Sequence, residues 1–325
     1  MAVYLVTGSA GFIGSRVSGM LLDAGHQVVG VDNHNAAYDV RLKDWRLAQL
    51  APRDGYNHHT EDICDFKAVE TLFSRYGHFD GVINLAARAG VRASVEDPWA
   101  FVNTNLTGTL NLLEMCQRSN TKKFVQASTS SIYGADAPIP TSEEADSSRP
   151  LQPYSASKKG AEAMCHSYHF LYDLDVTIFR FFTVYGPAGR PDMVMFRFIQ
   201  WIAEGKPVRL NGDGEQSRGF TFVDDIARGV ILGLKPLGYE IINLGGHETI
   251  TMNEMTRALE QLVGRKAQFE HYPFNKADML TNWANVDKAR RLLGWEARVN
   301  LEEGMRQAVE WYFAQRDWAS QVLTP

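Results

Sequence analysis

The sequence predicts an α/β fold in which a parallel β-sheet carries helices on both faces. Three observations predict this class. Short β-rich segments alternate with amphipathic helical segments over the first half of the chain, a glycine-rich turn joins the first strand to the first helix, and no internal repeat interrupts the alternation. Because strands joined through helices have right-handed crossovers, neighbouring strands should be parallel and the sheet doubly wound.

The expected elements define a larger and a smaller lobe. Strands are expected at Val3–Thr7, Val28–Asp32, Gly81–Leu85, Phe124–Ser128 and Val176–Arg180. Helices are expected at Gly11–Ala24, Phe66–Tyr76, Trp99–Arg118, Tyr154–Tyr172, Val194–Glu204 and Leu301–Arg316. Since the alternation loosens after residue 182, we predict one domain at 1–182 and a smaller, interleaved C-terminal α/β lobe at 183–325. The chain should return to the first domain near residues 220–245.

Composition and charge exclude several classes of protein. With 325 residues, 45% of them hydrophobic and 22% charged, the chain can bury a sizeable core and is not globally disordered. A net charge of -5 gives no electrostatic basis for binding nucleic acid or a membrane surface. The N-terminal apolar run is too short to span a bilayer. Cys64, Cys116 and Cys165 are too few and too scattered for a disulfide framework or a metal site, so we expect free thiols and a cytoplasmic location.

A glycine motif lies between the first expected strand and the first helix. In GSAGFIG, Gly8 permits a tight turn, Gly11 lets backbone amides approach a pyrophosphate, and Gly14 allows close helix packing. Asp32 ends the second strand, where its carboxylate can bind an adenosine ribose diol and would repel an additional phosphate. A Rossmann-like domain that binds NAD rather than NADP is therefore expected. Further cofactor contacts are expected from Phe12, Ile13, Asp62, Ile63, Leu85, Ala86 and Ala87.

The segment YSASK places a tyrosine and a lysine on one helical face. Tyr154 and Lys158 are four residues apart, and a nearby ammonium would favour the deprotonated form of a phenol whose reference pKa is about 10. Tyr154 could then accept a proton, and Lys158 could also bind the nicotinamide ribose. Upstream, STSSIYG supplies hydroxyls at a strand end. Thr129 and Ser130 there could donate hydrogen bonds to a sugar and help relay the proton.

These motifs occur in an order that resembles the extended short-chain dehydrogenases. GSAGFIG, NLAA, STSSIYG and YSASK carry the resemblance, which covers nearly the whole chain and includes GEQSRGFTFVDDIA, similar to that family's nucleotide-diphosphate segment. It implies bound NAD, a nucleotide sugar in the C-terminal lobe, and catalytic roles for Tyr154, Lys158 and Thr129. Three further segments, DNHNAAYDVRLKDWRLAQL, AARAGVRASVEDP and FRFFTVYGPAGRPDMVMF, resemble the UDP-glucuronate 4-epimerases more than the UDP-glucose 4-epimerases.

The resemblance implies a redox-neutral epimerisation of UDP-glucuronate to UDP-galacturonate. Tyr154 would remove the 4-hydroxyl proton while the hydride at carbon 4 passes to NAD, and the 4-keto sugar would rotate before the hydride returns. Ser131 stands where related decarboxylases and dehydratases carry an acidic residue, which removes a candidate acid/base. Thr183 stands where UDP-glucose 4-epimerases usually carry asparagine, which favours a uronic acid. Hydroxyls from Thr129, Ser130 and Thr183 would hold its carboxylate.

Further substrate contacts follow from charged residues in the matching segments. Arg190 and Arg218 are candidate ligands of the diphosphate or uridine, because guanidinium groups match phosphate oxygens. Arg88 replaces the glutamine expected in AAQAG and could bind substrate charge or pack at the pocket rim. In PFNKADML, Asn275 departs from the glutamine or arginine of relatives, whereas Asp278 keeps the pattern.

Other functions stay open at this point. The chain could instead be a UDP-glucose 4-epimerase or a UDP-glucuronate decarboxylase. A non-catalytic NAD-sensing regulator of the same fold is disfavoured by the intact Thr129, Tyr154 and Lys158, because a sensor needs no proton-transfer set.

A homodimer is the expected assembly. Relatives pair the helices that correspond to residues 99–118 and 154–172 into a four-helix bundle with twofold symmetry. The apolar residues Leu110, Leu113, Met164 and Phe170 exceed what one face of a sheet needs.

Overall fold

A seven-stranded parallel sheet forms the centre of the molecule. The computed structural model describes residues 1–246, 248–273 and 281–324. The strand order is β10-β6-β5-β4-β1-β2-β3, and every pairing in it is parallel. The strands are β1 Val3–Thr7, β2 Gln27–Val31, β3 Tyr56–His59, β4 Gly81–Asn84, β5 Lys123–Thr129, β6 Asp175–Phe181 and β10 Tyr239–Leu244. Because the order runs outward in both directions from β1 and β4, the predicted Rossmann-like, doubly wound sheet is confirmed.

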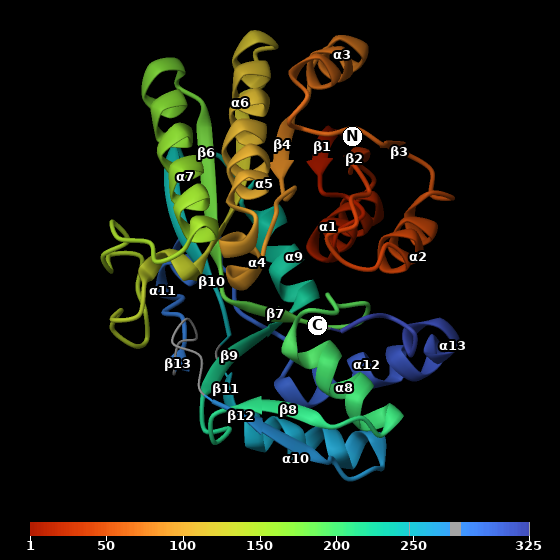
Figure 1. Cartoon of the computed structure of the whole chain (residues 1–325). Helices are drawn as coiled ribbons and strands as arrows, with labels where there is room; N and C mark the ends of the chain where they lie inside the picture. The colour runs from red at the N-terminus through yellow and green to blue at the C-terminus, as the bar shows by residue number, and fades with distance from the viewer. Residues whose placement is uncertain (247, 274–280, 325) are drawn as a thin grey trace.

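Helices cover both faces of this sheet (Figure 1). Successive strand residues point to opposite faces, so Val6 packs in the cluster that contains Val17, while its neighbour Leu5 packs in the cluster that contains Leu113. The first face carries α1 Phe12–Asp23, α2 Arg41–Leu50 and α9 Val223–Leu232, and the second carries α3 Phe66–Tyr76, α5 Pro98–Val102, α6 Gly108–Arg118 and α7 Pro153–Tyr172. A short helix, α4 Val91–Glu96, follows β4 in the chain, and α11 Asp287–Leu293 packs against β10.

The second half of the chain forms two small sheets and returns one strand to the large sheet. The sheets follow the order β11-β9-β13, with β7 also paired to β9, and β12-β8. Their strands are β7 Thr183–Tyr185, β8 Val208–Asn211, β9 Ser217–Phe222, β11 Glu248–Thr251, β12 Phe269–Tyr272 and β13 Thr281–Asn282. The helices of this half are α8 Val194–Glu204, α10 Met252–Val263, α12 Leu301–Ala314 and α13 Arg316–Ala319. Because β10 pairs with β6, the two lobes share chain segments; the domain boundary at residue 182 itself stays a prediction.

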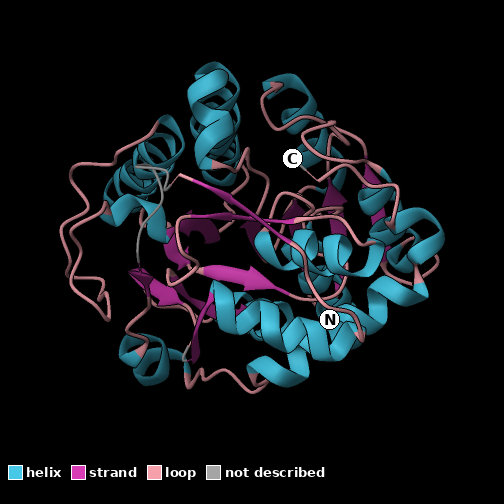
Figure 2. Cartoon of the chain, turned by 60° about the horizontal axis from the view of Figure 1, so that its bottom comes forward, coloured by secondary structure: helices cyan, strands magenta, loops and turns pink. Residues whose placement is uncertain are grey.

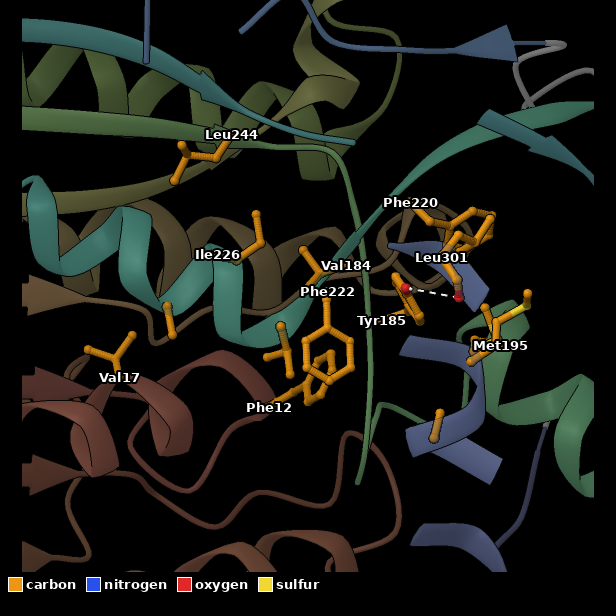
Figure 3. Packing of buried hydrophobic residues seen from close by; sticks show 14 of the residues in the cluster. Phe12, Val17, Val184, Tyr185, Met195, Phe220, Phe222, Ile226, Leu244 and Leu301 are labelled. Carbon is orange, nitrogen blue, oxygen red and sulfur yellow. Dashed lines mark hydrogen bonds between the residues drawn. The ribbon is translucent and has the colours of Figure 1, made fainter. Parts of the chain in front are cut away.

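One hydrophobic core joins the two lobes. Phe12 at the start of α1 belongs to the same buried cluster as Tyr185, Phe222 and Leu301 (Figure 3). The Tyr185 hydroxyl also donates a hydrogen bond to the Leu301 carbonyl at 3.4 Å. Seen from a second direction, the strands lie inside and the helices surround them (Figure 2). The shared core holds the smaller lobe against the carboxyl ends of the large sheet.

Two predicted helices differ from the structure by more than one residue at an end. The helix expected over 99–118 is interrupted by a π-helical turn at Asn103–Thr107, which separates α5 from α6. The buried Asn105 side chain in this turn bonds both backbone groups of Arg88 and the Ser157 hydroxyl, and such long-range contacts favour an insertion into a helix. The helix expected to end at Arg316 ends at Ala314.

The three thiols are free, as expected, with Cys116 and Cys165 buried and Cys64 half-buried. Over the described residues, every helix is too short or too polar to cross a membrane.

Candidate active site

A cavity of about 550 Å³ lies at the carboxyl ends of β1, β4 and β5, where the smaller lobe faces the sheet. Most of the predicted site residues line it together: Gly8, Gly11, Phe12, Ile13, Gly14, Asp32, Asp62, Ile63, Leu85, Ala86, Ala87, Thr129, Ser130, Ser131, Tyr154, Lys158, Thr183, Arg190 and Arg218. Arg88 does not line the cavity; its guanidinium instead reaches the Asn35 side chain at 3.4 Å. Asn275 and Asp278 lie outside the described residues.

The glycine loop is shaped by backbone contacts that a side chain would prevent. Gly8 has φ +67°, and a Cβ atom there would lie 2.8 Å from the Ala86 nitrogen. A Cβ atom at Gly14 would lie 2.0 Å from the Gly8 carbonyl oxygen, so the third glycine brings α1 against the loop itself. Within the described α1, no side chain caps the N-terminus and the first turn carries no acidic residue. The amides of this turn therefore suit a pyrophosphate such as that of NAD.

Asp32 is buried beside a lysine that the sequence analysis missed. Its Oδ1 atom accepts hydrogen bonds from Lys43 Nζ at 3.1 Å and from the His34 amide at 2.9 Å. Both side chains of the Asp32–Lys43 ion pair are at most 6% exposed, which orients the carboxylate before any ligand arrives. Lys43 also lines the cavity. The pair is suited to hold ribose hydroxyls, with the carboxylate as acceptor and the ammonium as donor.

The ends of β3 and β4 complete the wall on the adenosine side. Asp62 accepts hydrogen bonds from the Cys64 amide and the Asn33 side chain, both at 2.8 Å. The Ala86 amide donates to the Thr7 hydroxyl at 3.2 Å, which fixes the loop after β4 against β1. These bonds place the predicted cofactor contacts at the carboxyl edge of the sheet, the usual position of a dinucleotide in this architecture.

Tyr154 lies in the first turn of α7, half-buried and packed edge-on against Phe101 at a ring distance of 6.0 Å. Burial raises the pKa of its hydroxyl, whereas a hydrogen bond with Thr129 and the positive charge of Arg190 lower it. Lys158 was predicted to supply that charge. Arg190, which was predicted only as a substrate ligand, is a further cation whose charge lowers the pKa of Tyr154, and the effect of Lys158 stays a prediction.

Lys158 lies one turn after Tyr154 and is almost completely buried. Its ammonium donates to the Ala127 carbonyl at 3.1 Å. Burial lowers the pKa of Lys158 to about 8, although the nearby Glu162 carboxylate opposes that change. Glu162 belongs to a buried network that also contains Arg180 and Ser128, directly behind the catalytic wall. Lys158 therefore keeps its proton at neutral pH and can act as a donor.

Hydroxyl groups form the wall next to Tyr154. Thr129 Oγ1 donates to Ser131 Oγ at 3.2 Å and accepts from the Ser131 amide at 3.2 Å. Asn282, a residue absent from the predicted set, donates to Ser130 Oγ at 3.1 Å. Because Ser130 acts as an acceptor from Asn282, its own hydroxyl proton is left to point toward a ligand. Thr183 begins β7 on the same wall.

The two predicted arginines have different surroundings. Arg190 forms a bidentate ion pair with Asp192, at 3.0 and 2.6 Å, and donates to the Ala89 carbonyl at 3.0 Å. Arg218 lies on β9 and donates to the Ser217 carbonyl at 2.7 Å. Both line the cavity from the side of the smaller lobe, where a phosphate or uridine would find them.

Lys43, Asn282 and Arg46 are the residues that sequence reasoning missed. Lys43 and Arg46 lie three positions apart on α2 and are both buried, although α2 is a polar helix overall. Two cations three residues apart lie on one face of a helix, and this pattern near the expected ribose site could have indicated Lys43 and Arg46 as candidate site residues.

Comparison with known proteins identifies the family. A family model described as the NAD dependent epimerase/dehydratase family matches residues 4–245. The chain belongs to this family. Membership confirms the predicted assignment to the extended short-chain dehydrogenases and NAD as the cofactor.

Relatives and solved structures match over nearly the full length. The UDP-glucuronate 4-epimerase of Thermodesulfobacterium geofontis (strain OPF15) is 54% identical over 312 residues, which cover 96% of each chain. Among solved structures, UDP-glucuronic acid 4-epimerase from Bacillus cereus in complex with UDP-glucuronic acid and NAD has a TM-score of 0.90 and 34% identity, and covers 96% of this chain and 99% of that one. UDP-glucose 4-epimerase from Thermotoga maritima with UDP-glucose has a TM-score of 0.88 and 31% identity, with 97% and 99% coverage.

Proposed function

We propose that this protein is an NAD-dependent 4-epimerase that interconverts UDP-glucuronate and UDP-galacturonate. The observation that carries the proposal is the hydroxyl wall beside Tyr154, in which Ser131 occupies the place of an acidic residue in related decarboxylases. The carboxylates that line the described cavity are Asp32, Glu61 and Asp62 on the cofactor side, and Asp192, which is paired with Arg190. The names of the 54% identical relative and of the Bacillus cereus enzyme support the same activity.

The residues of the site have distinct roles in this reaction. Tyr154 accepts the proton of the 4-hydroxyl and returns it, and Thr129 holds the phenol through their hydrogen bond. Arg190 favours the phenolate by its charge. The glycine loop and Asp32 would hold NAD, Lys158 would donate to its ribose hydroxyls, and the bound cofactor would supply the hydride acceptor for carbon 4 of the sugar.

The substrate carboxylate is held by hydroxyl donors rather than by a salt bridge. Ser130 has a hydroxyl proton free to donate, because its oxygen already accepts from Asn282, and Ser131 carries a second hydroxyl on the cavity wall. Thr183 adds a third hydroxyl from β7. By fixing the carboxylate, these hydroxyls would disfavour its loss as carbon dioxide from a 4-keto sugar. Arg218 and Arg190 would bind the diphosphate or uridine.

The proposal predicts a preference for the uronate. Hydrogen bonds to a charged group contribute about 1.5–3 kcal/mol each, so the loss of two should lower kcat/KM for UDP-glucose at least about 100-fold. Chromatography of incubations with UDP-glucuronate and UDP-glucose, with carbon dioxide monitored, measures this. UDP-galacturonate should be the product, without carbon dioxide. Equal rates for the two sugars would refute the uronate assignment, and a carbon dioxide signal from the wild type would indicate a decarboxylase.

Thr183→Val and Ser130→Ala should impair turnover of UDP-glucuronate, because each removes a hydroxyl proposed to hold the substrate carboxylate.

We also propose that the protein is a homodimer in the cytoplasm. Leu113 is fully buried in the core, and Leu110 and Met164 pack against the same cluster, so these three residues do not support the dimer as predicted. Exposed apolar residues are found on the neighbouring helices α4, α5 and α7 (Figure 1) and include Val95, Trp99, Val102, Phe170 and Leu171. With Trp99 75% and Phe170 78% exposed, these helices present apolar side chains that are suited to self-association.

Light scattering at micromolar concentration should therefore give twice the mass of the 36.4 kDa chain. Trp99→Glu combined with Phe170→Glu should give the mass of one chain, because charges would enter the apolar contact. A monomeric wild type would contradict the dimer.

A further inference from the structure

Arg46 on α2 is a buried cation whose N–H groups all point at oxygen atoms of other segments. It is 2% exposed. Nε and Nη2 donate to the Ala188 carbonyl at 3.1 and 2.6 Å, and Nη2 also approaches the Gly189 carbonyl at 3.4 Å. Nη1 donates to the Ala10 carbonyl at 3.2 Å and to the Tyr38 hydroxyl at 2.7 Å. The five donors of the guanidinium are thus used to join three separate stretches of chain.

Arg46 forms no ion pair with a carboxylate of the described residues, although it is buried. A buried charge without a counter-ion is costly, and here it is stabilised only by carbonyl and hydroxyl dipoles and by the rings of Phe12 and Tyr38, at 5.8 and 5.5 Å. An apolar residue on α2 would avoid that cost. The arrangement therefore indicates that these carbonyl groups need a fixed position.

The loop held by Arg46 has a backbone conformation that requires support. Ala188 has φ +54°, in the left-handed region that residues with a side chain rarely adopt. This conformation is strained for a residue with a side chain, and it turns the Ala188 carbonyl toward the guanidinium. The two hydrogen bonds from Arg46 to that carbonyl offset this strain. Without these two hydrogen bonds, the loop should relax toward a conformation in which Ala188 is not strained.

The same loop carries Arg190, whose guanidinium packs on the same Tyr38 ring as that of Arg46. The Arg190 guanidinium lies 5.8 Å from the centre of the Tyr38 ring, while that of Arg46 lies 5.5 Å from it. Arg190 then donates to the Ala89 carbonyl on the cavity wall. On its other side, Arg46 holds Ala10 between the first two glycines of the cofactor loop.

We propose that Arg46 is a positioning residue: by holding the Ala188 loop against the glycine loop, it places the Arg190 guanidinium beside Tyr154. Arg46 itself forms none of its hydrogen bonds with Tyr154, the residue that exchanges the proton with the sugar. Through Arg46, the position of Arg190 depends on the position of the glycine loop. The cofactor side and the substrate side of the cavity are therefore assembled together. This inference rests on the proposed function only through the substrate used in the assay.

The charged groups around this part of the site include Arg190 with its partner Asp192, and Lys158, which lies one turn from Tyr154 on α7. Arg190 acts on Tyr154, and Asp192, Tyr38 and Tyr154 act on Arg190. Because the positive charge of Arg190 lowers the pKa of Tyr154, moving it away raises that pKa. The reacting form of Tyr154 is deprotonated, so the acidic limb of the kcat/KM profile should then move to higher pH.

The test compares Arg46→Met and Arg190→Met, singly and together, in the holoenzyme. Arg46→Met should lower kcat/KM for UDP-glucuronate about 10- to 100-fold at neutral pH, and its acidic limb should move toward that of Arg190→Met. In the double variant, Arg46→Met should add less than about threefold to the loss caused by Arg190→Met, because both changes remove the same interaction. Arg46→Lys, which keeps the charge, should fall between the wild type and Arg46→Met.

A second readout does not depend on turnover. Since Arg46 anchors Ala10, dialysed Arg46→Met should retain less NAD than the wild type, measured by extraction and absorbance. Arg53→Met is the matched control: Arg53 follows α2 and bonds Gly19 and Asp23 without touching either loop. It should change neither the pH profile nor NAD retention.

Two results would overturn the proposal: an acidic limb of the kcat/KM profile that does not shift in Arg46→Met, or losses of kcat/KM that are fully additive in the double variant. If Arg46→Met does not fold, the acidic limb of the kcat/KM profile of Arg46→Lys decides the question. A wild type inactive on UDP-glucuronate would refute the proposed function instead.

Discussion

Tyr154→Phe should lower kcat about 100- to 10,000-fold while the enzyme still binds NAD. The substitution removes only the hydroxyl, which is the group that exchanges a proton with the sugar. The ring keeps its edge-on contact with Phe101, so the first turn of α7 should stay folded. Steady-state turnover of UDP-glucuronate measures the loss, and NAD extracted from the purified variant shows whether the cofactor site persists.

A second tyrosine on the same helix provides the control. The Tyr168 hydroxyl donates to Glu114 at 2.8 Å, away from the cavity lining, so Tyr168→Phe should leave kcat unchanged. If Tyr154→Phe kept more than a tenth of wild-type turnover, Tyr154 would not be the proton acceptor and the assigned mechanism would be wrong.

Glu162→Gln should reduce the free energy of unfolding by about 3–5 kcal/mol. Glu162 and Arg180 form a bidentate pair at 3.0 and 2.8 Å, and each side chain is 2% exposed. Ser128 also donates to Glu162 at 2.6 Å. Glutamine keeps the shape but removes the charge, which leaves the Arg180 guanidinium buried without a counter-ion. Urea unfolding of both proteins, monitored by tryptophan fluorescence, measures the difference.

The contribution of Glu162 to the free energy of unfolding should also depend on pH. Burial by itself raises the pKa of Glu162, but the hydrogen bonds and charge of Arg180 outweigh burial and hold that pKa below its ordinary value of 4.5. The stabilisation is therefore complete above that ordinary value and is lost as the pH falls through the pKa of the folded state. Glu162→Gln should lack this component of acid unfolding.

A surface carboxylate gives the comparison for Glu162. Glu114 pairs with Arg118 at 2.9 Å, and the two side chains are 32% and 48% exposed. Glu114→Gln should therefore cost at most about 1 kcal/mol. If Glu162→Gln were no more destabilising than Glu114→Gln, the buried pair would not support the fold behind Lys158.

Local patterns were sufficient to predict five of the seven strands of the large sheet, all except β3 and β10, and most of the cavity. The strand Val3–Thr7 and the helices Phe66–Tyr76 and Val194–Glu204 have the predicted limits, because apolar periodicity reflects the faces that a strand or helix buries. Gly8, Gly14 and the pair Tyr154 and Lys158 were found by spacing, since turn geometry and helical pitch fix where residues so close in the chain must lie. The parallel order of the strands then brings these motifs to one edge of the sheet.

Contacts between distant segments were decided only by the tertiary structure. Arg46 and Ala188 are 142 residues apart, and Ser130 and Asn282 are 152 apart. Nothing in the local pattern around either member predicts the other. The same holds for Leu113, which periodicity marks as apolar but which the core, rather than a second subunit, covers. A backbone repeat determines which way a side chain points, whereas its partner depends on how all the layers pack together.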